Sequence, residues 1–184
     1  MLKVGLIVGS TRPNRFADIP ARWLVEGASA RRHLQLSVLD LRDFRCHFST
    51  SRGPRWPPGA SSLSPRQRLG ANVSAGSTPS WPESAESNHG PTAVLKNAFD
   101  SALNEWQRKP IAFVGYGGVG AARAIETLRG VVIELQMAPI TYEVNVAMEP
   151  FLGILQKGRA LDDYEYLCKA ARPCSITSRG GAGR

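Results

Sequence analysis

The sequence predicts an α/β domain built on a parallel sheet, and three stretches carry this prediction. Residues 3–9 form a short apolar run rich in β-branched side chains that ends in a polar loop, which is typical of a buried strand. Residues 18–32 place Asp18 and Pro20 at a helix start and then apolar side chains at helical spacing. Residues 34–41 alternate with period two, so a β-α-β unit opens the chain.

Strands and helices also alternate in the second half of the chain. We expect a helix from residue 91 to about 106, a strand over 111–114, a helix over about 121–136, a strand over 139–146 and a last helix over 161–171. The whole chain, residues 1–184, suits a single domain that can bury a core without disulfides or a structural metal. Its three cysteines show no CxxC spacing, so we predict no metal site.

Two segments look unlike the rest of the chain. In residues 45–87, ten Ser, six Pro and four Gly occupy 20 of the 43 positions, and neither a helical nor a strand period is present. A structureless stretch of this length is unusual inside a compact domain, so we interpret it as a disordered insertion or as altered sequence. Residues 168–184 form a second atypical segment, a tail rich in Ser, Gly and Arg.

The net charge of +8 is confined largely to these two segments. Residues 45–87 hold five Arg and two Glu, and residues 168–184 hold one Lys, three Arg and no acid. This distribution argues against the basic patch of a nucleic-acid binder, an alternative that steeply salt-dependent binding would reveal. No apolar run approaches the roughly 20 residues of a membrane span, and the first residues lack a signal-peptide pattern. We therefore expect a soluble, cytoplasmic protein with neither nucleic acid nor membrane as a partner.

The loop Gly-Ser-Thr-Arg-Pro-Asn-Arg, residues 9–15, is a candidate phosphate site. It follows the first strand, at the sheet edge where open α/β folds bind ligands, and it precedes a helix with unpaired N–H groups. Ser10 and Thr11 add hydroxyl donors, and Arg12 and Arg15 add charged donors for phosphate oxygens. A helix cap with two solvated arginines is the alternative interpretation.

Two further loops could contact a flat ligand. Asn88 and His89 stand at a helix start, where polar groups could bond the edge of a planar ring, although a lone His in a loop is more often a surface residue. Residues 115–120 formally match G-x-G-x-x-G, with Glu143 23 positions after the last Gly. They indicate either a Rossmann-type NAD(P)-binding loop or glycines that let a flat ligand approach the backbone.

Three motifs together resemble the NADPH-dependent FMN reductases of the flavodoxin-like fold. These are GSTRPNR after the first strand, SNHGPTAVLKNAFD in the middle and FVGYGGVGAARAIETLR further on, in the order of the family. The resemblance covers residues 1–44 and 88–167. It implies a three-layer sandwich with a five-stranded parallel sheet of order 2-1-3-4-5, FMN across the strand ends and NADPH as hydride donor. It further implies a small acceptor such as a quinone, and assembly as a homodimer or homotetramer.

The same resemblance implies a set of FMN-binding residues. One group falls on the phosphate loop, a second on the family's Pro-Glu-Tyr-Asn motif beside the flavin ring, and a third on the glycines at the ring's other edge. In this order they are Ser10, Arg12, Asn14, Arg15 and Phe16, then Glu86, Asn88 and His89, then Gly117 and Gly118. The family chemistry implies no protein nucleophile, general base or metal.

The residues before Asn88 depart from the family pattern. Ala85 and Ser87 replace Pro and Tyr of the motif, and no apolar strand precedes them, so we expect the central third strand to be missing or degraded. We hypothesise that residues 45 to about 87, and the tail from about Cys168, are read out of frame from a GC-rich gene. Reading the nucleotide sequence in the other frames tests this directly.

A missing central strand would have a large energetic effect. Five buried apolar residues contribute roughly 8–15 kcal/mol, and the net stability of a domain is about 5–15 kcal/mol. We therefore expect poor folding or weak flavin binding. Besides an active reductase, an inactive remnant of one and a Rossmann-type NAD(P)-binding protein are the alternatives.

Overall fold

The computed structural model describes residues 1–44 and 79–177 and contains one five-stranded parallel sheet. Its strands lie in the order β2-β1-β3-β4-β5. They are β1 (Leu2–Val8), β2 (Leu34–Asp40), β3 (Ser80–Ala85), β4 (Pro110–Tyr116) and β5 (Ala138–Val146). The strand order confirms the predicted flavodoxin-like topology.

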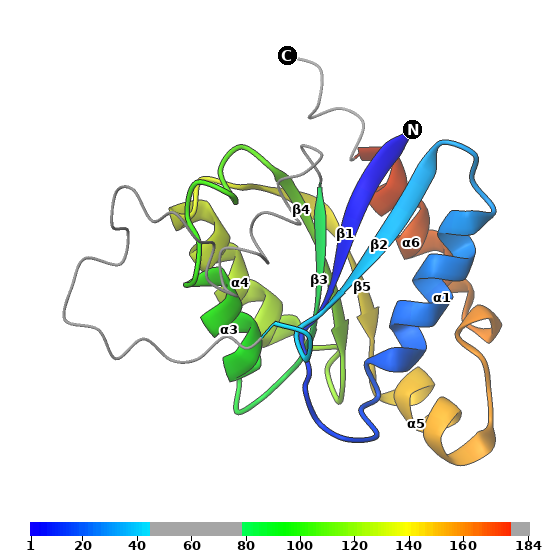
Figure 1. Ribbon diagram of the computed structural model, residues 1–184. Helices are drawn as coiled ribbons and strands as arrows, with labels where there is room; N and C mark the ends of the chain where they lie inside the picture. The colour runs from blue at the N-terminus through cyan, green and yellow to red at the C-terminus, as the bar shows by residue number, and fades with distance from the viewer. Residues whose placement is uncertain (45–78, 178–184) are drawn as a thin grey trace.

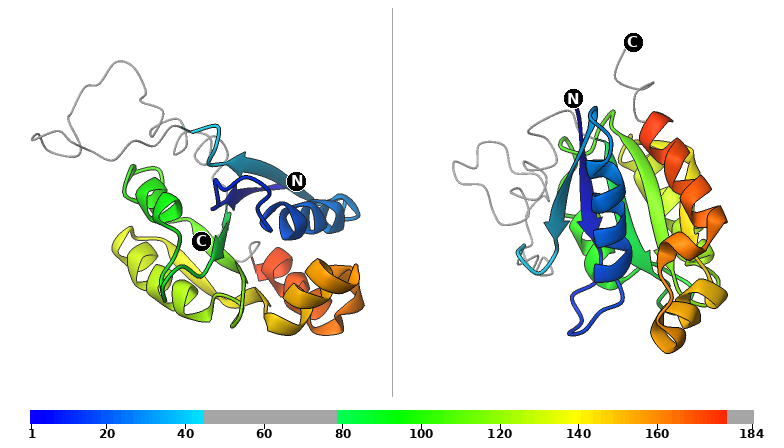
Figure 2. Two further views of the ribbon diagram at one scale, coloured as in Figure 1. Left: turned by 90° about the horizontal axis from the view of Figure 1, so that it is seen from below. Right: turned by 90° about the vertical axis from the view of Figure 1, so that its right-hand side faces the viewer.

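Helices cover both faces of the sheet and make three layers (Figures 1 and 2). The helices are α1 (Asp18–Ser29), α3 (Ala93–Phe99), α4 (Ala122–Glu134), α5 (Met148–Lys157) and α6 (Glu165–Thr177), with a short 3₁₀ turn η1 (Leu161–Asp163). Helices α3 and α4 lie on one face, and α1, α5 and α6 lie on the other. Each face has its own buried apolar cluster, one around Phe99 and Phe113 and the other around Trp81 and Val114. No helix in the described part of the chain is both long and apolar enough to cross a membrane.

The helix boundaries differ from the prediction at three places. Helix α3 ends at Phe99 rather than near Trp106, although the two rings still pack at a centroid distance of 5.2 Å. Helix α5 was not predicted; Pro150 lies in its first turn, and Gly158, whose φ is 62°, caps its end after Lys157. Helix α6 extends to Thr177, so the end predicted near residue 171 is wrong, and the rest of the atypical tail, residues 178–184, lies outside the described residues.

The expectation that the central strand is missing is wrong. Residues 80–85 form β3 between β1 and β4, where the Gly9 N–H donates to the Glu83 carbonyl at 3.0 Å. Buried backbone groups of β1 and β4 need partners, and any extended segment can supply them. Within the atypical segment, residues 79–87 are therefore ordered, whereas residues 45–78 lie outside the described residues.

The side chains of β3 suit this central position poorly. Ser80, Glu83 and Ser84 are buried, and Pro82 has no N–H to donate in the sheet. In the part of the chain that the structure describes, five buried side-chain atoms have no hydrogen-bond partner, and four of them belong to Ser80, Trp81 and Glu83. The reading-frame hypothesis for residues 45–87 stays a prediction, which the nucleotide sequence tests.

The buried carboxyl of Glu83 should make the stability of the fold depend on pH. The side chain is fully buried and its burial raises the pKa of the carboxyl well above its ordinary value, so the folded chain holds the neutral acid. The unfolded chain titrates near the ordinary Glu pKa of about 4.3. The contribution of Glu83 to stability is therefore fully present below that pH and is lost as the pH rises above it.

We expect Glu83→Leu to raise the free energy of unfolding at neutral pH by about 1–3 kcal/mol, because it removes a buried carboxyl without a partner. It should also flatten the fall of stability between about pH 5 and pH 8. Urea unfolding across this range measures both effects, and Glu126→Gln on the exposed side of α4 is the control. An unchanged pH dependence in Glu83→Leu would contradict the buried neutral acid.

Candidate functional site

The exit of β1 passes so close to β3 that only glycine fits. A Cβ atom on Gly9 would lie 2.1 Å from the Glu83 carbonyl oxygen. The Thr92 hydroxyl, just before α3, donates to the Gly9 carbonyl at 2.5 Å. The predicted phosphate loop is therefore anchored at its first residue to both β3 and the start of α3.

Arg15 binds carboxylates of its own chain. Its Nη1 and Nη2 donate to the two carboxylate oxygens of Asp40, at the end of β2, at 2.8 and 2.5 Å. Its Nε donates to Asp18 Oδ1 at 2.7 Å, and Nη1 also donates to the Ser10 carbonyl. These bonds use most of the five N–H donors of the guanidinium, and only 4% of the side chain is exposed. Arg15 therefore shapes the loop.

The same ion pair shifts the pKa of both partners. The hydrogen bond to Asp40 is the largest cause that raises the pKa of Arg15 above its ordinary value. Burial by itself would raise the pKa of the Asp40 carboxyl, but the hydrogen bonds that it accepts outweigh burial and lower it. Both groups are therefore charged at neutral pH. Arg12, by contrast, has an exposed side chain at the rim of the loop.

Glu86 connects the end of β3 to the start of α4. Its Oε1 accepts from Arg123 Nε at 2.6 Å, and its Oε2 accepts from the Arg123 backbone N–H at 3.3 Å. The hydrogen bond from the guanidinium lowers the pKa of Glu86. A carboxylate at the first turn of a helix also interacts favourably with the helix dipole.

Asn88 and His89 form the tip of a tight turn. Ser87 and Gly90 exchange two backbone hydrogen bonds of 2.8 and 3.0 Å across it. Both central residues have positive φ, 50° for Asn88 and 65° for His89, a geometry in which Asn is favoured. Both side chains are exposed.

The glycines at the end of β4 and in the loop after it serve mainly to let the chain pack closely on itself. A Cβ on Gly115 would lie 2.2 Å from the Gly120 carbonyl, and a Cβ on Gly120 would lie 2.7 Å from Asn145 Cβ. The G-x-G-x-x-G spacing is therefore explained by packing, and the strand order is not that of a Rossmann fold. Glu143, the acid of that alternative, instead accepts from Arg129 Nη2 at 3.1 Å. Gly117 differs, because with φ at 128° no atom lies within 4 Å of where its Cβ would be.

These loops surround a cleft of about 290 Å³ at the carboxyl ends of β1, β3 and β4, which we call the switch-point cleft. The strand order reverses between β1 and β3, and open α/β sheets bind ligands at this point. Seven of the ten predicted residues line it, namely Ser10, Arg12, Asn14, Arg15, Phe16, Glu86 and Gly117. Asn88, His89 and Gly118 are not among the residues that line it.

Sequence reasoning missed six residues that line the cleft, Pro13, Ala85, Ser87, Thr92, Tyr116 and Phe151. Phe16 packs against Tyr116 and Phe151 with ring centroids 5.2 and 4.5 Å away. Phe151 comes from α5, a helix that was itself not predicted. An aromatic residue between Gly115 and Gly117, directly after a strand, was the signal that could have revealed Tyr116.

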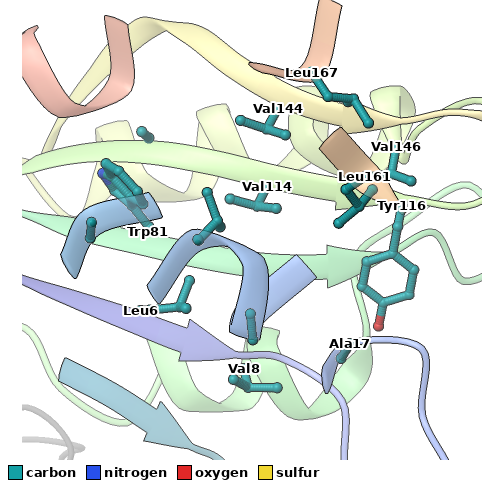
Figure 3. Packing of buried hydrophobic residues seen from close by; sticks show 14 of the residues in the cluster. Leu6, Val8, Ala17, Trp81, Val114, Tyr116, Val144, Val146, Leu161 and Leu167 are labelled. Atoms are coloured by element: carbon teal, nitrogen blue, oxygen red, sulfur yellow. The ribbon is translucent and has the colours of Figure 1, made fainter. Parts of the chain in front are cut away.

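Tyr116 places a neutral hydroxyl in the wall of the cleft. Its side chain points toward the loop that ends at Ala17 (Figure 3), where it shares a hydrogen bond with Ser10. Burial raises its pKa above the ordinary value, so the hydroxyl remains protonated at neutral pH. The cleft thus combines an exposed cation, hydroxyl groups, aromatic rings and a glycine with open space beside it.

A flavodoxin-like α/β domain with a polar cleft at its switch point is the class that this fold and site define. Residues 83–150 match the family model described as NADPH-dependent FMN reductase. An NAD(P)H-dependent FMN reductase of Schizosaccharomyces pombe is 28% identical over 140 residues, 74% of this chain and 70% of that protein. One of Saccharomyces cerevisiae is 29% identical over 153 residues, 74% of this chain and 76% of that protein. The chain is therefore similar to the NADPH-dependent FMN reductases.

Solved structures share this fold. FerB, a flavoenzyme NAD(P)H:(acceptor) oxidoreductase from Paracoccus denitrificans, superposes with a TM-score of 0.69 at 19% identity, over 97% of this chain and 95% of that chain. A flavodoxin variant from Pseudomonas aeruginosa superposes with a TM-score of 0.56 at 17% identity, over 93% and 97% of the two chains.

The two arginines of the loop should contribute differently to the stability of the fold. We expect Arg15→Gln to lower the free energy of unfolding by about 1–3 kcal/mol, since it removes hydrogen bonds between charged groups and leaves Asp40 without its main partner. Arg12→Gln should change stability by less than about 0.5 kcal/mol, because this side chain is exposed. Urea unfolding without added flavin measures both, and equal losses would contradict the assignment.

Proposed function

We propose that this chain is an NAD(P)H-dependent FMN reductase that binds FMN in the switch-point cleft. The observation that supports this most directly is the gathering of Ser10, Arg12, Glu86 and Gly117, from three separate loops, around one cleft. The cleft is near the lower end of the size range of small-molecule sites, so FMN would fill it and remain partly exposed. The exposed remainder would be open to NAD(P)H and to the acceptor.

The loop after β1 fits the phosphate of FMN. Ser10 lines the cleft beside Tyr116, and Arg12 adds an exposed guanidinium that can bind phosphate oxygens in a bidentate manner. Asn14 adds an amide donor, from a residue with φ at 50°. In this proposal Arg15 acts on the phosphate through the loop, because its own hydrogen bonds go to Asp40, Asp18 and the Ser10 carbonyl.

The opposite end of the cleft fits a flat ring. The open space beside Gly117 lets a ring approach the backbone closely, because no Cβ stands in the way. Ser87 adds a hydroxyl group at this end, and Glu86 is held in place by Arg123. Asn88 and His89, at the tip of the adjoining turn, and Gly118, beside Gly117, are proposed contacts at the rim of the ring.

Bound FMN would accept hydride from NAD(P)H and pass electrons to a small acceptor such as a quinone. The chain's own part is to hold the phosphate with cationic and hydroxyl donors, to position the ring, and to keep the Tyr116 proton in place. No side chain is assigned as a nucleophile or general base. Cytoplasmic location and assembly as a homodimer or homotetramer belong to this proposal as expectations from the family.

The absorbance spectrum of the purified chain mixed with FMN tests the proposal. We expect retained flavin absorbance after gel filtration, its loss when NADPH is added without oxygen, and its return when a quinone is added. Free FMN at the same concentration is the control. If the chain folds but retains no flavin, the result indicates an inactive remnant of a reductase. NADPH binding without flavin indicates instead a nicotinamide-binding protein.

The role of Arg12 is tested by comparing FMN with riboflavin, which lacks the phosphate. We expect Arg12→Gln to weaken FMN binding about tenfold and to leave riboflavin binding unchanged, because only the phosphate interacts with the guanidinium. Arg32→Gln, exposed after the end of α1, makes the same charge change far from the cleft and should affect neither ligand. Equal losses for both ligands in Arg12→Gln would contradict a phosphate contact.

A further inference from the structure

Tyr116 extends from the end of β4 to the loop after β1. It is the last residue of β4, and in the sheet β3 lies between β4 and β1. Figure 3 shows its hydroxyl pointing toward the loop that ends at Ala17. The hydroxyl shares a hydrogen bond with Ser10, and both residues line the switch-point cleft. A strand on the far side of β3 thus contributes a polar group to the predicted phosphate loop.

The ring of Tyr116 is held by its neighbours, so its hydroxyl has a defined position. Only 5% of the residue is exposed, and the ring packs against Phe16 with a centroid distance of 5.2 Å. Phe16 in turn packs against Phe151 at 4.5 Å. Because burial raises the pKa of the hydroxyl, Tyr116 keeps its proton at neutral pH. It is therefore an oriented, uncharged hydrogen-bond donor.

The two hydroxyl groups hold one more proton than their shared hydrogen bond uses. Ser10 and Tyr116 each carry one O–H, and a single bond between the two oxygens takes up one of these protons. Within residues 1–44 and 79–177, neither hydroxyl has a second acceptor. Both residues are buried, and a buried O–H without an acceptor is unfavourable. An oxygen of a molecule bound in the cleft would accept the remaining proton.

Two other side-chain donors near this pair already bind the protein. The Thr92 hydroxyl donates to a backbone carbonyl of the loop, and Arg15 binds two carboxylates. Arg12 differs, because within the described residues its exposed guanidinium has neither an ion pair nor a hydrogen bond. Both guanidinium groups lie close enough to lower the pKa of the Tyr116 hydroxyl, although burial outweighs them. The free proton and the guanidinium of Arg12 together suit an anion.

We propose that Tyr116 donates its O–H to the phosphate of FMN and, together with Arg12, makes the cleft prefer FMN over riboflavin. This role rests on the proposed function, because it needs FMN bound with its phosphate at the loop after β1. A hydrogen bond to an ionised acceptor is stronger than one between neutral groups, so a phosphate oxygen is a better partner for this O–H than a neutral oxygen of the flavin. Tyr116 is thus a specificity-determining residue of the site.

Fluorescence titrations of the full chain with FMN and with riboflavin test this role. Tyr116→Phe keeps the ring and its contact with Phe16 and removes only the hydroxyl, so we expect FMN binding to weaken about tenfold and riboflavin binding to stay unchanged. Tyr142→Phe, at an exposed position of β5 outside the cleft, makes the same change and should affect neither ligand. Equal weakening for both ligands, or unchanged FMN binding, in Tyr116→Phe would overturn the inference and leave the proposed function in place.

A double variant separates a phosphate contact from an effect on the shape of the loop. Arg12→Gln combined with Tyr116→Phe removes both donors, so its preference for FMN over riboflavin should be smaller than that of either single variant. Urea unfolding without flavin checks that each variant is folded. A double variant that prefers FMN as strongly as Arg12→Gln alone would show that Tyr116 does not contact the phosphate. If the folded wild-type chain binds neither flavin, this inference and the proposed function are both wrong.

Discussion

The ion pair between Arg15 and Asp40 determines the shape of the loop on which the proposed flavin site depends. It connects the loop after β1 to the end of β2, and the bond from Arg15 to Asp18 adds the start of α1. Only 4% of the Arg15 side chain and 23% of the Asp40 side chain are exposed, so this pair is better shielded from water than a surface ion pair, whereas Asp18 is 46% exposed. Arg15, which the loop motif suggested as a phosphate ligand, thus holds the loop in the shape that leaves Arg12 exposed.

The central strand shows how backbone and side-chain requirements can oppose each other. The backbone of β3 completes the ladders with β1 and β4, which a parallel sheet needs on both sides. Its side chains include a buried Glu83 without a partner among the described residues and a proline at position 82. The polar strand is therefore a source of instability in an otherwise regular fold.

Strand β3 also takes part in building the switch-point cleft. Its last residue, Ala85, and the adjoining Glu86 line the cleft. The Glu83 carbonyl accepts from the Gly9 N–H at the base of the phosphate loop. The short segment that departs most from the family pattern therefore contacts the proposed flavin site.

The sequence by itself determined the β-α-β opening, because strand periodicity and helix starts are local properties. The strand order followed from the resemblance to the FMN reductases, and the structure has that order. The residues proposed for the switch-point cleft came from the loop motifs and from the same resemblance. Tertiary structure alone decided that residues 80–85 form a strand, since that depends on the gap between β1 and β4 rather than on their own side chains. It likewise decided the partners of Arg15, which include Asp40, 25 positions away. Phe151 reaches the cleft only through the packing of α5. Contacts between distant segments carry no periodic signal, so they become visible only once the chain is folded.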